Sequence, residues 1–134
     1  MKNVYLQTFK SHGSTEDGFL TAIEQSTGLP FDVKRVYTVV NTKENNVRGY
    51  HAHKTLWQIF FAVHGKIDVC AEDVEGNIET FELSTSNVGL VCGPHIWHTI
   101  TYHGSAILMV LASEEYHEED YIRDYEEFRK LQNR

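Results

Sequence analysis

The chain has 134 residues, of which 41% are hydrophobic and 12% aromatic, and it carries a formal net charge of −7. This length predicts one domain over residues 1–134, and the acidic balance argues against binding to nucleic acid, which depends on clustered Lys and Arg. Because the longest apolar runs, 59–63 and 106–112, are far shorter than the roughly 20 residues that cross a bilayer, and no signal-like apolar region follows Met1, we expect a cytoplasmic protein without membrane contact.

Short apolar segments alternate along the chain with turn signals, which predicts an all-β protein. The expected strands cover residues 5–9, 18–24, 33–41, 56–63, 67–72, 78–83, 88–92, 98–102 and 106–112. Gly-containing signals at His64-Gly65 and His103-Gly104 are expected to end strands. This number and spacing of strands is typical of a β-sandwich or barrel.

One helix is expected, over residues 118–132. Apolar and aromatic residues recur there at helical spacing: Tyr121, Ile122, Tyr125, Phe128 and Leu131. Acidic residues occupy its first turn and basic residues its last, which complements the helix dipole. We expect its apolar stripe to pack on the core.

Two histidines separated by one residue, His51 and His53, form the most informative motif of the chain. Alternation on a strand places both imidazoles on the same face. His98, beyond the Gly93-Pro94 turn, is a candidate to join them. Histidine transfers protons near neutral pH and is also the commonest neutral metal ligand, so both chemistries remain open at this point. The other histidines are expected at the surface: His12, His64, His95, His103 and His117.

Several cations lie near this motif in the sequence. Arg35, Arg48 and Lys54 offer local positive charge in an otherwise acidic chain. They are therefore candidates to bind a single phosphorylated ligand.

The region from Gly49 to Gly65 resembles the first cupin motif, with His51, His53 and Gln58 at its central positions. Gly89, Pro94 and His98 resemble the second motif more loosely. The resemblance implies a small double-sheet jelly roll. In metal-binding cupins the two paired histidines, a glutamate and the later histidine hold a divalent ion, but Gln58 stands here where that glutamate is expected. An amide gives a divalent cation no charge compensation, so we expect no metal, and a metal-dependent dioxygenase or isomerase remains the alternative.

At finer resolution the chain resembles the cupin-fold sugar 3,4-ketoisomerases that act on dTDP-4-keto-6-deoxyglucose. The blocks that carry this resemblance are 30–31, 34–37, 48–54, 88–90, 93–94, 97–98, 110–113 and 120–125. It implies an isomerase that moves the ketone of a dTDP-linked sugar from C4 to C3 without metal or cofactor. It also implies a homodimer with exchanged N-terminal strands and a role in deoxysugar biosynthesis for surface polysaccharide.

The resemblance further implies roles for individual residues. His51 is the expected base and His53 the expected proton shuttle to C4, with Tyr37 as a catalytic hydrogen-bond partner of the sugar. Arg48 is the expected pyrophosphate clamp. The other candidates for substrate binding are Arg35, Lys54, Gln58, Trp97 and His98. Gln58 reaches the histidine face only if the chain turns between Lys54 and Leu56, and Trp97 is expected to be a wall or core residue.

One position departs from the family pattern. Asp17 stands where the family usually has an arginine, which leaves the C4 configuration of the product open. A sugar-binding cupin without catalytic activity is a further alternative, which a product assay would distinguish from an enzyme.

Overall fold

The computed structural model describes residues 1–131, and within them it has ten strands, two 3₁₀ turns and one short α-helix. The strands are β1 (Val4–Thr8), β2 (Ser11–Ser14), β3 (Gly18–Thr21), β4 (Arg35–Val39), β5 (Val47–His53), β6 (Gln58–Glu72), β7 (Ile78–Leu83), β8 (Val88–Cys92), β9 (Trp97–Ala112) and β10 (Tyr121–Ile122). The 3₁₀ turns are η1 (Gln25–Thr27) and η2 (Glu118–Asp120), and the helix is α1 (Tyr125–Lys130).

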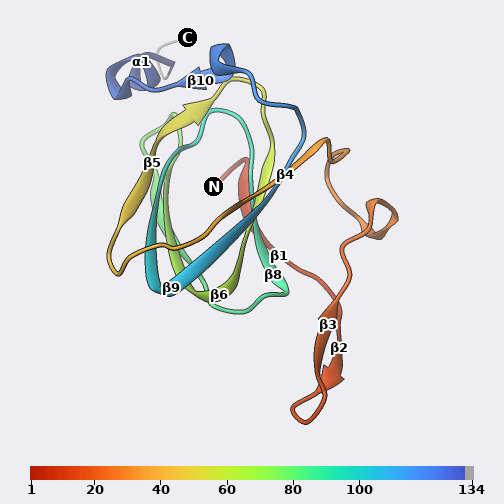
Figure 1. Cartoon of the computed structure of the whole chain (residues 1–134). Coiled ribbons are helices and arrows are strands. Elements are labelled where there is room, and N and C mark those ends of the chain that lie inside the picture. Colours follow the sequence, from red (N-terminus) through yellow and green to blue (C-terminus); the bar gives the residue numbers. More distant parts are fainter. Residues whose placement is uncertain (132–134) are drawn as a thin grey trace.

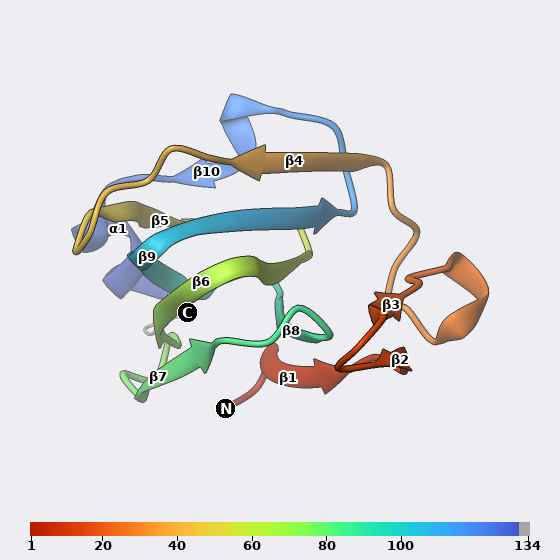
Figure 2. The same ribbon diagram turned by 60° about the horizontal axis from the view of Figure 1, so that its bottom comes forward.

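Two long strands, β6 and β9, build the fold. They pair antiparallel along nearly their whole length, and each changes its other partners half-way. The first half of β6 pairs with β8, which in turn pairs with β1, and the last half of β9 pairs with β4. The last half of β6 pairs with β7, and the first half of β9 pairs with β5, which in turn pairs with β10. The strands therefore curl into two facing layers (Figures 1 and 2). This confirms the predicted cupin-type double-sheet jelly roll with a short C-terminal helix.

Glycine-containing bulges form the corner between the layers. The pairing of β6 with β9 shifts register on both sides of His64. Gly65 has a φ of +73°, and a Cβ at this position would lie 2.6 Å from the carbonyl oxygen of His103, so a side chain does not fit. His64-Gly65 and His103-Gly104 thus bend two continuous strands. The prediction that they end four shorter strands was wrong, because antiparallel pairing continues across the corner.

The segment before α1 is extended where a helix was expected. The prediction of a helix over 118–132 was wrong in its first half, because residues 118–120 form η2 and Tyr121–Ile122 pairs with β5 as strand β10. The predicted end at Gln132 lies outside the described residues.

The helix itself starts at a capping residue. The side chain of Asp124 accepts a hydrogen bond from the backbone N–H of Glu126, which satisfies a free donor of the first turn. Ile122 and Phe128 are both buried. A short strand followed by a short helix therefore satisfies the same apolar spacing that a single helix would.

Three hydrophobic clusters stabilise the fold. The largest fills the space between the sheets and includes Phe60, Tyr102 and Val110. A second lies on an outer face, where apolar side chains from residues 23–33 cover buried residues of β6, β8 and β9. The third packs the helix and β10 against Ala52 of β5. No helix of residues 1–131 is long and apolar enough to cross a membrane.

A hairpin made of β2 and β3 projects from the sandwich, as both views show (Figures 1 and 2). Within the described chain these two strands pair only with each other. Phe19 and Leu20 on this hairpin are 64% and 63% exposed. The hairpin thus presents an apolar surface to its surroundings.

Candidate active site

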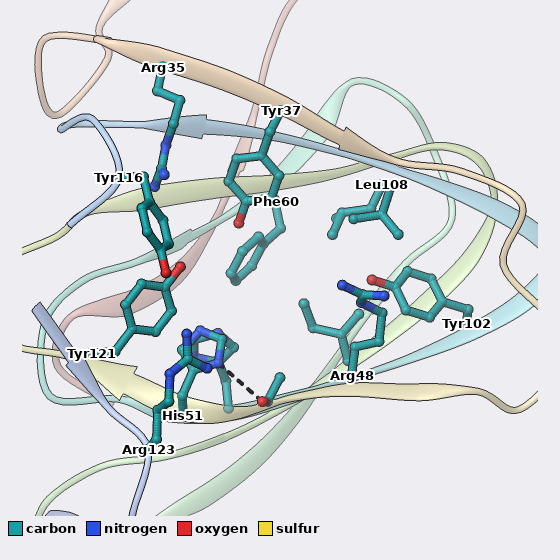
Figure 3. A pocket seen from close by; sticks show the side chains of 14 residues that line it. Arg35, Tyr37, Arg48, His51, Phe60, Tyr102, Leu108, Tyr116, Tyr121 and Arg123 are labelled. Carbon is teal, nitrogen blue, oxygen red and sulfur yellow. Dashed lines mark hydrogen bonds between the residues drawn. The ribbon is translucent and has the colours of Figure 1, made fainter. Parts of the chain in front are cut away.

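A cavity of about 400 Å³ opens between the layers and contains part of the predicted site. Its walls come from β4, β5, β6 and β9 and from residues 116–123 of the C-terminal segment. Figure 3 shows this arrangement, with His51 on the floor and Tyr37 on the opposite wall. Alternation along β4 explains one wall, because Arg35, Tyr37 and Val39 point inward and the residues between them are exposed.

A bulge in β5 decides which of its side chains face the cavity. Arg48 pairs with Ile100, and His51 pairs with His98, so β5 has one residue more than β9 over this stretch. Strict alternation would place Arg48 and His51 on opposite faces, but the extra residue brings both to the same one. Gly49 makes the bulge possible, since its φ is +103° and a Cβ would lie 2.8 Å from the carbonyl oxygen of His98.

The three histidines expected to converge lie together at this bulge. The ring centroid of His51 is 4.9 Å from that of His53 and 4.7 Å from that of His98, and the latter two rings are 6.3 Å apart. His51 and His98 line the cavity, whereas His53 is 3% exposed and lies behind them. His51 is therefore best placed to touch a bound molecule.

Backbone carbonyls fix the protonation of two of these rings. Nδ1 of His51 lies 3.1 Å from the carbonyl oxygen of Gly49, and Nδ1 of His98 lies 3.2 Å from that of Ile96. A carbonyl oxygen only accepts hydrogen bonds, so each Nδ1 carries the proton. Nε2 of both rings then keeps its lone pair. A neutral imidazole of this form is ready to accept a proton.

Burial keeps the cluster uncharged. Desolvation lowers the pKa of His51 and holds that of His98 well below its ordinary value. Desolvation and the neighbouring His51 lower the pKa of His53 to about 4, although Asp120 opposes the shift. All three imidazoles are therefore neutral at pH 7.

Tyr37 offers a hydrogen-bond donor on the opposite wall. The side-chain Nε2 of Gln58 donates to the Tyr37 oxygen at 2.8 Å, which leaves the phenol proton free for another acceptor. Burial raises the pKa of Tyr37, so the phenol stays protonated. The tyrosine can thus donate to an oxygen of a molecule in the cavity.

Positive charge lies on two sides of the cavity. Arg35 and Arg123 are on one side and Arg48 with Tyr102 on the other (Figure 3). Glu118 accepts two hydrogen bonds from Arg123, at 2.7 and 2.9 Å. No ion pair within residues 1–131 engages Arg48.

Three of the predicted substrate-binding residues do not line this cavity. Lys54 follows the end of β5 and its side chain lines a different hollow, beside α1. Trp97 faces the opposite side of β9 from His98 and packs against Tyr125 and Phe128. Gln58 is 2% exposed and reaches the site only through Tyr37. The chain does bend between Lys54 and Leu56, which was the condition for Gln58 to approach the face of β5 that carries His51 and His53.

Two further residues, His103 and Asp17, lie outside the cavity. His103 was expected at the surface but is half-buried, because Nδ1 contacts Glu44 at 2.8 Å and Nε2 contacts Asp68 at 3.0 Å. Asp17 lies in the turn between β2 and β3 and does not line the cavity of its own chain.

The fold brings to the site four residues for which no role there was predicted. Tyr116, Tyr121 and Arg123 line the cavity, and Asp120 contacts Nδ1 of His53 at 3.1 Å. The sequence feature that could have indicated Asp120, Tyr121 and Arg123 was the block at 120–125. This block carried the family resemblance, but it was expected to form part of a helix. Within residues 1–131, no group of three or more His, Cys, Asp or Glu side chains has the geometry to hold a metal ion.

Comparison with known proteins places the chain in a family. A family model described as "FdtA: WxcM-like, C-terminal" matches residues 2–133. The chain belongs to this family. It is 43% identical over 115 residues to the TDP-4-oxo-6-deoxy-alpha-D-glucose-3,4-oxoisomerase of Aneurinibacillus thermoaerophilus, which covers 84% of this chain and 81% of the relative.

Solved structures of sugar 3,4-ketoisomerases superimpose on nearly the whole chain. QdtA from Thermoanaerobacterium thermosaccharolyticum, a sugar 3,4-ketoisomerase solved with TDP, is 34% identical with a TM-score of 0.92, over 99% of this chain and 96% of QdtA. A variant of QdtA has been solved with TDP-4-keto-6-deoxyglucose. WlaRB from Campylobacter jejuni, a TDP-quinovose 3,4-ketoisomerase, is 34% identical with a TM-score of 0.89, over 97% of this chain and 99% of WlaRB.

The burial of the three imidazoles should lower the pKa values at which they titrate. We expect NMR to show His51, His53 and His98 titrating below 6.5. Because a folded pKa below the unfolded value destabilises the folded state in acid, the free energy of unfolding should fall as pH drops from 6.5 toward about 4. His103 provides the contrast, since its bond to Glu44 raises its pKa. A His53 that titrates at or above 6.5 would contradict the described burial.

Proposed function

We propose that the chain is a sugar nucleotide 3,4-ketoisomerase that converts dTDP-4-keto-6-deoxyglucose to a dTDP-3-keto-6-deoxyhexose. The observation that carries this proposal is a neutral His51 on the floor of a cavity, in a family whose relatives are named as enzymes of this reaction. The QdtA complexes with TDP and with TDP-4-keto-6-deoxyglucose support a dTDP-sugar as the ligand.

The chemistry needs only proton transfers. The C4 ketone acidifies the proton on C3, and Nε2 of His51 removes it. The C4 oxygen gains a proton as the electrons of the broken C–H bond form a C3–C4 double bond, which gives an enediol. The C3 hydroxyl then loses its proton, and C4 gains one. The ketone now lies at C3, and no atom or electron has been gained or lost.

The proposed roles follow from position. His51 faces the cavity and is the proposed base. The Tyr37 hydroxyl and His98 are proposed to bind the sugar oxygens whose charge changes. His53 lies behind His51, and the two imidazole rings meet edge to face. We propose that His53 relays the proton that returns to C4.

Arg48 is the proposed pyrophosphate clamp. It lies on the cavity wall, and a guanidinium binds phosphate oxygens in a bidentate manner. Its freedom from the ion pairs of the described chain favours it over Arg123, whose charge Glu118 already compensates. Arg35 is proposed as a second cation, since its Nε has no hydrogen-bond partner within residues 1–131.

We further propose that residues 1–134 act as one domain in a homodimer with exchanged N-terminal strands. The family match over residues 2–133 supports the single domain. The projecting hairpin with its exposed Phe19 and Leu20 supports the exchange, because an apolar hairpin of this kind is stabilised by a second chain. The free thiols of Cys70 and Cys92 support a cytoplasmic location.

Proton exchange should separate the roles of the histidines. In deuterated water, proton NMR should show the wild-type protein forming the 3-keto product from dTDP-4-keto-6-deoxyglucose. His51→Asn should abolish deuterium exchange at C3, because no enediol forms. His53→Asn should retain some exchange and slow product formation by at least roughly a hundredfold, the usual contribution of a positioned acid-base group.

His95→Asn is the control, since His95 is exposed and lies outside the cavity. If His53→Asn stops exchange while His51→Asn does not, the two roles are reversed. If the wild-type protein binds the sugar but yields no product, the chain is a binding cupin instead.

Arg48→Ala should weaken binding of the nucleotide sugar by about 2 kcal/mol, the cost of losing a charge-assisted hydrogen bond. Calorimetry would then show a dissociation constant roughly 30-fold higher. Lys54→Ala is the matched control, because it removes a nearby positive charge that lies outside the cavity. Equal losses in the two variants would point to a general charge effect and would remove Arg48 from the site.

The dimer should depend on the hairpin. Changing both Phe19 and Leu20 to Asp should shift the protein from dimer to monomer in sedimentation equilibrium, because charges replace the apolar contact. Ile78→Asp is the control, since Ile78 is 65% exposed but lies on β7. A dimer that survives the double change would show that the hairpin is not exchanged.

A further inference from the structure

A single carboxylate receives four hydrogen-bond donors beside the histidine cluster. Oδ1 of Asp120 accepts the backbone N–H and the hydroxyl of Thr55, both at 2.8 Å. Oδ2 accepts the backbone N–H of Leu56 at 3.3 Å and lies 3.1 Å from Nδ1 of His53. The turn between β5 and β6 therefore wraps around this side chain.

These donors keep Asp120 ionised. Burial alone would raise its pKa, but the hydrogen bonds from Thr55 and the other neighbours lower it below the ordinary value. An ionised carboxylate only accepts hydrogen bonds, so Nδ1 of His53 must carry a proton and donate it. The other ring nitrogen, Nε2, is buried and has no hydrogen-bond partner within residues 1–131.

An unpaired ring nitrogen at this depth needs an explanation. A buried polar atom without a partner costs free energy, and such atoms are rare in folded proteins. Nε2 of His53 keeps a lone pair only while Nδ1 holds the proton. The state of this nitrogen therefore depends on the group that Nδ1 contacts, which is Asp120.

We propose that Asp120 is a positioning residue that fixes His53 with its proton on Nδ1 and its lone pair on Nε2, and that stabilises the imidazolium formed when His53 takes up a proton. This inference rests on the proposed isomerisation. Asp120 does not line the cavity, so it acts through His53 and not on the substrate. The carboxylate restores part of the proton affinity that burial removes from His53.

Asp120→Asn tests this because an amide has one donor end and one acceptor end. Thr55 and Leu56 both present backbone N–H groups, and the Thr55 bond is the shorter at 2.8 Å against 3.3 Å. The amide oxygen should stay on Thr55, which turns the amide nitrogen toward His53. Nδ1 must then accept, and the proton moves to Nε2, where it blocks proton uptake.

The first measurement uses the wild-type protein alone. Nitrogen-15 NMR of the imidazoles at pH 7 should show His53 neutral, with Nδ1 protonated and Nε2 unprotonated. A proton on Nε2 would overturn the proposal without any variant. Asp120→Asn should then move the proton to Nε2, and retention of the wild-type tautomer would equally overturn the proposal.

The second measurement is kinetic. Asp120→Asn should lower kcat by at least roughly a hundredfold with little change in KM, and should retain deuterium exchange at C3, as expected if only the relay through His53 is lost. A purely structural role would instead lower both the stability and the exchange. Asp124→Asn is the control on the same segment, since Asn caps a helix as well as Asp. It should keep wild-type kcat.

The outcomes separate this inference from the proposed function. If the wild-type protein does not convert dTDP-4-keto-6-deoxyglucose, the proposed function fails, and the NMR measurement still decides whether Asp120 sets the tautomer. If the wild-type protein is active and Asp120→Asn keeps its full kcat, the role of Asp120 fails and the proposed function stands.

Discussion

One additional residue in β5 sets the geometry on which the site depends. The bulge at Gly49 and Tyr50 turns Arg48 and His51 to the same face, and it does so where β5 runs against His98 of β9. Without it, the cation and the base would lie on opposite sides of the sheet. The bulge in turn depends on Gly49, whose missing side chain leaves room for a carbonyl oxygen. The convergence of charge and imidazole is thus a property of the backbone.

The C-terminal segment supplies the wall of the cavity that the bulge in β5 does not form. Ile122 and Phe128 bury themselves against β5, and Glu72 of β6 accepts hydrogen bonds from Tyr125 at 2.9 Å and from Arg129 at 2.8 Å. These contacts hold β10 beside His53. Each is small on its own, but together they hold Tyr121 and Arg123 in the cavity wall. The packing of α1 against the outer face of the sheet therefore helps to position the residues that line the cavity.

Periodicity in the sequence predicted the features that depend on local pattern. Alternation placed His51 beside His53, and the strand count indicated the jelly roll. Apart from the convergence of His98 with the histidine pair, features that depend on distant contacts were missed. Asp120 meets His53 across 67 positions, and nothing local signals that contact. The same apolar spacing fits a helix or a strand followed by a helix, so β10 was not recognised. Lys54 was a candidate because it lies near the histidine motif in sequence, and Trp97 because of the family resemblance, but neither lines the cavity.

The late position of β10 in the chain has a consequence for the order of assembly. The strands that carry the three histidines and Tyr37 all precede residue 113, whereas Tyr116, Tyr121 and Arg123 follow it. The imidazole cluster therefore stays open to water on one side until residues 116–123 dock beside β5. Closing the long loop between β5 and β10 costs entropy, which the packing of Ile122 and Phe128 against β5 offsets. The cavity thus gains its last wall only when this segment docks on the sheet.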